Sequence, residues 1–161
     1  MLSPFALVQE IRTFFDGPLL LAGAIAHGRS ILAAQALGAD LAYVGSAFIA
    51  TREASATDAY KQGVVDGRAG DIVYTNLFTG VHGNYLRASI VAAGLDPENL
   101  PTSDPSKMNF GSGGASAAKA WRDIWGCGQG IGAITSVQSV SDLVAQFTRQ
   151  YDDAKRALLA P

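Results

Sequence analysis

The sequence predicts an α/β fold with short parallel strands, and two observations support this prediction. Continuous apolar segments of strand length occupy residues 19–22 and 41–44, which is typical of strands buried on both faces. A helical segment lies between them, with short loops on either side. A strand, a helix and a second strand joined in this way form a right-handed crossover between parallel strands.

The first helix is expected to begin at Ser3-Pro4. Serine is a good N-cap, and proline is tolerated at the first helical position because that position needs no N–H donor. Apolar residues then recur at helical spacing until Asp16-Gly17-Pro18, which ends the helix just before the first strand.

The second helix is predicted over about residues 30–37, with Ser30 as its N-cap and Gly38 as the glycine that follows its C-terminus. After the second strand, Thr51 is expected to cap a helix over about residues 52–62. Glu53 would then lie in the first turn of that helix, where an acidic side chain is favourable.

The last helix of the chain has the strongest pattern. Ser139 and Asp142 have the spacing of a capping box, and apolar residues line one face of the segment that follows. The segments before it are assigned by composition: turn-rich 70–80, helical 84–93, loop-like 95–117, a short helix at 121–125 and a glycine segment at 126–132.

Composition excludes several classes of protein. The chain has 161 residues and a formal net charge of −2, which argues against a nucleic-acid partner or an anionic membrane surface. A single cysteine and two histidines exclude a disulfide framework and predict no metal site. No apolar run is long enough for a membrane span and no signal peptide is evident, so we expect a soluble cytoplasmic protein.

The two strand-end turns are the candidate binding elements. Gly23-Ala24 and Gly45-Ser46 each follow a predicted strand. Glycine lets the backbone approach phosphate oxygens closely, and such turns after the last two strands of a β/α barrel form its usual phosphate site. The structural alternative is that these glycines only make tight turns.

The glycine segment is a weak match to a dinucleotide-binding motif, because no strand precedes it. The alternatives are a flexible loop or a loop in which Gln129 anchors a flat heterocycle. His27, His82 and Cys127 have no partners at catalytic spacing, and we expect them to have no catalytic role.

Four segments together carry a family resemblance. Residues 20–29, 33–40 and 43–53, followed by 125–132, resemble the nitronate monooxygenases, which are FMN-dependent β/α barrels. The resemblance implies that this chain is the C-terminal part of a (β/α)8 TIM barrel, with its last two parallel strands plus C-terminal helices. Residues 1–52 would then supply the barrel β/α units and residues 53–161 a helical and loop region.

The resemblance also implies FMN-binding roles. Gly23 and Ala24 would donate backbone N–H groups after the seventh strand. The family motif has two glycines there, so Ala24 departs from it, and its methyl group should be tolerated if its φ is negative. Residues at the end of the eighth strand would close on the FMN phosphate, and two residues of the glycine segment would border the flavin. These last two groups are Tyr43, Val44, Gly45 and Ser46, and Gln129 and Gly130.

The family oxidises alkyl nitronates with flavin and O₂ to a carbonyl compound and nitrite. Its proposed catalytic histidine lies in a Gly-Gly-His loop that has no counterpart here, so the catalytic residues are unknown. A whole barrel needs about 250 residues, and we expect the chain to need a missing N-terminal half or self-association. The alternative functions are a non-catalytic phosphate-binding or assembly fragment and an FMN-dependent enoyl or quinone reductase of the same fold.

Overall fold

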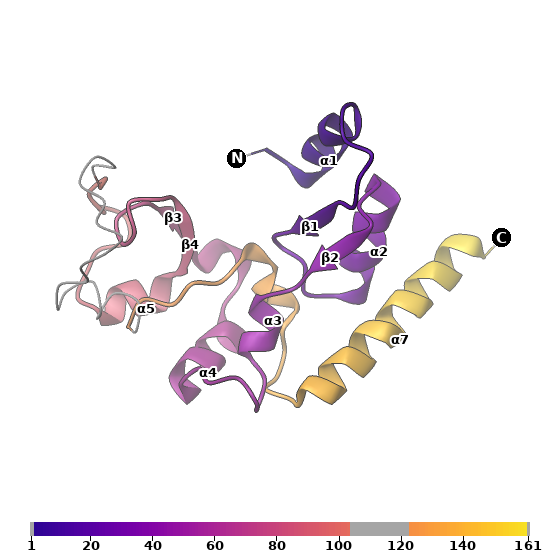
Figure 1. Cartoon of the computed structure of the whole chain (residues 1–161). Helices are drawn as coiled ribbons and strands as arrows, with labels where there is room; N and C mark the ends of the chain where they lie inside the picture. The colour runs from indigo at the N-terminus through magenta and orange to yellow at the C-terminus, as the bar shows by residue number, and fades with distance from the viewer. Residues whose placement is uncertain (1, 104–122, 161) are drawn as a thin grey trace.

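The structure, a computed structural model, describes residues 2–103 and 123–160. Figure 1 shows strands β1 and β2 beside helix α2, with the long helix α7 on one side of the molecule and the β3–β4 hairpin on the other. Within the described residues, no helix is both long and apolar enough to cross a membrane. Two clusters of buried side chains form the core, one around β1 and α2 and a larger one beneath α3, α4 and α7.

The predicted parallel strand pair is confirmed. β1 (Leu20–Ala22) pairs with β2 (Leu41–Tyr43) in parallel, and α2 (Gly28–Leu37) connects them. The register places Leu20 opposite Leu41 and Ala22 opposite Tyr43. The chain is therefore of the α/β class, with short parallel strands.

The N-cap predicted for α2 is wrong. The helix begins at Gly28, and the cap is His27, whose Nδ1 accepts a hydrogen bond from the Arg29 N–H at 3.0 Å. Ser30 therefore lies inside the first turn. The predicted end is confirmed, because Gly38 adopts φ of 107°, a left-handed conformation that suits glycine.

A polar junction holds α1 (Pro4–Arg12) to the start of both strands. The Asp40 carboxylate accepts from the Leu19 N–H and from the Arg12 guanidinium, each at 2.7 Å. The same guanidinium donates to the Gly38 and Gly17 carbonyls at 2.8 and 2.7 Å. The Leu19 N–H and then Arg12 lower the pKa of the Asp40 carboxyl.

The predicted amphipathic last helix is confirmed as α7 (Val140–Leu159), and it packs on α2. The Ser139 hydroxyl oxygen caps it by accepting from the Asp142 N–H at 3.0 Å. The two helices approach closely at Gly28, where a built Cβ atom would lie 2.5 Å from the Phe147 carbonyl oxygen. The Gly28 N–H also donates to the Gln150 side chain at 2.9 Å, so this contact requires glycine.

The helix predicted over 52–62 begins later than expected. α4 spans Asp58–Asp66, and the Thr57 hydroxyl caps it by accepting from the Tyr60 N–H. Thr51 instead is buried and donates to the Phe48 carbonyl at 2.8 Å, at the end of the short helix α3 (Ser46–Ile49), which the sequence analysis did not predict.

A hairpin replaces part of the helix predicted over 84–93. β3 (Ile72–Thr75) pairs antiparallel with β4 (Gly83–Leu86), and only then does α5 (Arg87–Ala92) begin. Residues 125–127 bond to the free side of β4, through the Leu86 N–H to the Trp125 carbonyl and the Cys127 N–H to the Asn84 carbonyl. The short 3-10 helices η1 (Ala69–Asp71) and η3 (Gln129–Ala133) complete the described elements.

Two sequence predictions fall partly on undescribed residues. Residues 121 and 122 of the short helix predicted at 121–125, and residues 104–117 of the loop predicted at 95–117, lie outside the described residues.

The contact between α2 and α7 leads to a first prediction. Gly28→Ala is expected to lower the free energy of unfolding by about 3 kcal/mol, because the added methyl group overlaps the α7 backbone. Urea unfolding followed by circular dichroism measures the change. Gly70→Ala is the matched control, since a Cβ atom there meets nothing within 4 Å, and it should change stability by less than about 0.5 kcal/mol. Equal effects of the two substitutions would contradict this account.

The polar junction leads to a second prediction. Because the pKa of Asp40 is lowered, its carboxylate stabilises the fold above about pH 4. This contribution is lost as the pH falls through the lowered pKa. Asp40→Asn should therefore be less stable than the unsubstituted chain at neutral pH, and the difference should shrink on acidification. Denaturant unfolding at neutral pH and at pH values below about 4 measures the difference in free energy of unfolding between Asp40→Asn and the unsubstituted chain. Asp16→Asn, at an exposed aspartate, is the control. A difference that does not change with pH would contradict this account.

Candidate functional site

The two strand-end turns meet in one pocket. Parallel strands place their carboxyl ends at the same edge of a sheet, so the turns after β1 and β2 lie side by side. Between them is a pocket of about 230 Å³, which the glycine segment 126–132 also borders. Its lining residues are Ala22, Gly23, Ala24, Ile25, Ala26, Tyr43, Gly45, Ser46, Gly128 and Gly130.

Most of the residues predicted to bind a cofactor line this pocket. Val44 and Gln129 do not: Val44 is half-buried and packs against both core clusters, and Gln129 is exposed. Gly128 lines the pocket although the sequence analysis did not single it out. The clustering of glycines at 126–132 is the signal from which Gly128 could have been found.

Ala24 does not meet the condition under which its methyl group was expected to be tolerated. That condition was a negative φ, whereas its φ is +55°, and Gly23 before it has φ of +101°. A left-handed conformation costs a residue with a Cβ atom about 1–2 kcal/mol. Gly130 lies against this peptide, so close that a Cβ atom built on it would be 2.7 Å from the Ala24 carbonyl oxygen, and the close approach therefore requires glycine at position 130.

Ser46 joins the second turn to the glycine segment. Its hydroxyl oxygen accepts a hydrogen bond from the Gly128 N–H at 2.8 Å. This leaves the hydroxyl hydrogen available to donate to a ligand in the pocket. One side chain therefore both shapes the pocket wall and offers a donor to its contents.

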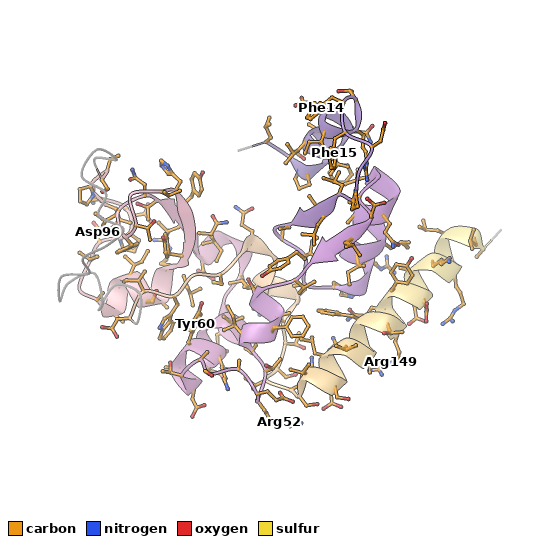
Figure 2. All side chains as sticks on the ribbon, in the orientation of Figure 1. Phe14, Phe15, Arg52, Tyr60, Asp96 and Arg149 are labelled. Carbon is orange, nitrogen blue, oxygen red and sulfur yellow. The ribbon has the colours of Figure 1, made fainter. Side chains whose placement is uncertain are left out.

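Two aromatic side chains and a buried thiol pack at the start of the glycine segment 126–132. Tyr60 of α4, labelled in Figure 2, donates to the Gly126 carbonyl and stacks on Trp125 with ring centroids 5.2 Å apart. Cys127 is buried, and burial raises the pKa of its thiol to about 12. Burial, and then the neighbouring Cys127, raise the pKa of Tyr60 to about 12. Both groups therefore stay protonated at neutral pH and act as packing elements.

The histidines lie outside the pocket. His27 uses Nδ1 to cap α2, and the His82 ring stacks on Tyr74 at 4.9 Å. None of the described pocket-lining residues carries a charged side chain. Within the described part of the chain, no three His, Cys, Asp or Glu side chains gather as a metal site would require. The pocket is thus a neutral, backbone-lined site suited to binding.

The sequence comparisons point to one family. A sequence model of the nitronate monooxygenase family matches residues 2–150. A nitronate monooxygenase of Paraburkholderia phytofirmans is 31% identical over 155 residues, which cover 92% of this chain and 42% of that protein. A probable nitronate monooxygenase of Staphylococcus haemolyticus is 28% identical, with 93% and 43% covered. The chain thus spans about two fifths of the length of these curated relatives.

Two solved structures share the fold of this chain. FabK from Thermotoga maritima superposes with a TM-score of 0.74 at 24% identity, covering 98% of this chain and 51% of that one. Nitroalkane oxidase from Streptomyces ansochromogenes superposes with a TM-score of 0.74 at 26% identity, covering 98% and 46%. The fold comparison agrees with the family match over nearly the whole chain, and the chain belongs to the nitronate monooxygenase family.

Proposed function

We propose that this chain forms the phosphate-binding end of an FMN-dependent nitronate monooxygenase. In this proposal β1 and β2 are the last two strands of a (β/α)8 barrel, and Gly23, Ala24, Gly45 and Ser46 surround the phosphate. The observation that carries the proposal is the pocket at the carboxyl edge of two paired parallel strands, lined by both of their turns. Phosphate sites of β/α barrels lie at this position.

The pocket residues fit a phosphate group. A Cβ atom built at Gly23 or Gly45 meets nothing within 4 Å, so a ligand can approach the backbone closely at both turns. Hydrogen-bond donors there are peptide N–H groups and the Ser46 hydroxyl. The volume of about 230 Å³ is below the usual range for a whole small-molecule ligand, about 300–1,000 Å³. The pocket therefore suits the phosphate end of FMN rather than the whole cofactor.

The chemistry in this proposal is divided between cofactor and protein. Bound FMN supplies the electron transfer by which an alkyl nitronate and O₂ become a carbonyl compound and nitrite. Residues of this chain bind the phosphate tail and, through Ser46 and Gly128, fix the wall beside it. A tail held in a rigid pocket sets where the rest of the cofactor lies.

FMN should bind through its phosphate. Titration of the chain with FMN and with riboflavin, followed by flavin fluorescence, is expected to show FMN binding at least about tenfold tighter, because hydrogen bonds to a charged group contribute about 1.5–3 kcal/mol. Inorganic phosphate should compete with FMN. Equal binding of the two flavins would show that the pocket does not hold the phosphate.

The reaction itself is tested by incubating the FMN-loaded protein with an alkyl nitronate in air and measuring nitrite release. If nitrite is not released but NAD(P)H is oxidised with an enoyl or quinone substrate, the result would favour a reductase.

The Ser46 hydroxyl should strengthen the binding of FMN. Ser46→Ala removes the acceptor for the Gly128 N–H and the donor to the phosphate, so FMN binding is expected to weaken about tenfold. Ser46→Thr keeps the hydroxyl and serves as the control, with affinity close to that of the unsubstituted chain. The same fluorescence titration measures both variants. Equal losses in the two variants would assign the effect to packing rather than to the hydroxyl.

A further inference from the structure

The glycines that line the pocket differ in whether the fold itself requires them. Gly23 has φ of +101°, a conformation that residues with a Cβ atom rarely adopt. At Gly130 a built Cβ atom would lie 2.7 Å from the Ala24 carbonyl oxygen, which is too close for any side chain. The backbone alone therefore accounts for glycine at both of these positions.

Gly128 is different, because its backbone and its described neighbours do not require glycine. Its φ is −87° and its ψ is 165°, an extended conformation that any residue adopts. A Cβ atom built there would lie 3.6 Å from the Ser46 Oγ atom and 3.8 Å from the Ala24 backbone nitrogen. Both are ordinary van der Waals distances, so an alanine at position 128 would fit without displacing either neighbour.

The two atoms that a side chain at position 128 would meet are both hydrogen-bond donors. The Ser46 hydroxyl oxygen accepts from the Gly128 N–H at 2.8 Å, so the hydroxyl hydrogen can be donated elsewhere. The Ala24 N–H has no acceptor within the described residues. All three residues line the pocket. The space left by the absent side chain of Gly128 therefore lies beside two donors that a ligand can use.

We propose that this space holds a phosphate oxygen, and that residue 128 thereby determines whether the pocket accepts a phosphate group. An oxygen that accepts from a hydroxyl and from a peptide N–H lies about 2.7–3.2 Å from each donor atom. A methyl group in van der Waals contact with the same two atoms takes up the space that this oxygen needs. The inference rests on the proposed function, and it names the residue that selects a phosphorylated ligand.

The selection is steric, because the pocket attracts phosphate through neutral donors. None of the described pocket-lining residues carries a charged side chain, so no cation there can compensate for the hydrogen bonds that a displaced phosphate loses. Riboflavin has no phosphate and does not use this space. A methyl group at position 128 should therefore remove the preference for FMN over riboflavin without weakening the binding of riboflavin.

Gly128→Ala tests this inference, with Gly132→Ala as its matched control. Gly132 belongs to the same segment but does not line the pocket, and a Cβ atom built on it would lie 3.6 Å from the Arg68 Cδ atom, an ordinary contact. FMN and riboflavin are titrated separately into the unsubstituted chain and into each variant, and flavin fluorescence reports the binding.

The expected result is a change in the ratio of the two affinities. The unsubstituted chain and Gly132→Ala should bind FMN at least about tenfold more tightly than riboflavin. In Gly128→Ala this preference should fall to less than about twofold, while the affinity for riboflavin stays the same. Inorganic phosphate should compete with FMN in the unsubstituted chain and in Gly132→Ala, but not in Gly128→Ala.

The outcomes separate this inference from the proposed function. If Gly128→Ala keeps the preference for FMN, or weakens the binding of both flavins equally, the inference is wrong and the proposed function stands. If the unsubstituted chain itself does not prefer FMN, both are wrong. Urea unfolding provides the structural check: a lower midpoint for Gly128→Ala than for Gly132→Ala would show that the fold requires glycine at position 128, and would also overturn the inference.

Discussion

Parallel pairing of β1 with β2 is the constraint on which the rest of the structure depends. Because the strands run in the same direction, the chain must return through α2, and both strand-end turns arrive at one edge of the sheet. The polar junction of Arg12 and Asp40 fixes the opposite edge, where both strands begin. Helix α7 then packs against α2, beside which it lies in Figure 1, and its Leu143 and Phe147 belong to the larger core cluster.

The sequence predicted those parts of the fold whose signals are local. The apolar runs at 19–22 and 41–44 and the glycine after α2 lie within the elements that they define. The β3–β4 hairpin was missed for the opposite reason. β4 is stabilised by residues 125–127, about forty positions further along the chain, and Asn84 before apolar residues locally favours a helix. Its tertiary pairing overrides that local preference.

The site shows the same division between local and distant signals. The turns at Gly23 and Gly45 were predicted as binding elements because each follows its own strand, and the structure brings them together. The part of the pocket that the glycine segment 126–132 forms was only partly predicted. Gly128 reaches the pocket through a hydrogen bond to Ser46, which lies 82 positions earlier. The left-handed conformation of Ala24 was not predicted, because the sequence around it does not show that the distant Gly130 packs against its peptide.

Burial of Cys127 has a practical consequence for how this protein can be studied. It is the single cysteine of the chain, and with a pKa of about 12 its thiol has almost no reactive thiolate at neutral pH. A cysteine introduced at an exposed position would therefore react alone with a maleimide or a spin label. Pairs of such probes could report distances across the molecule while the buried Cys127 thiol stays unlabelled.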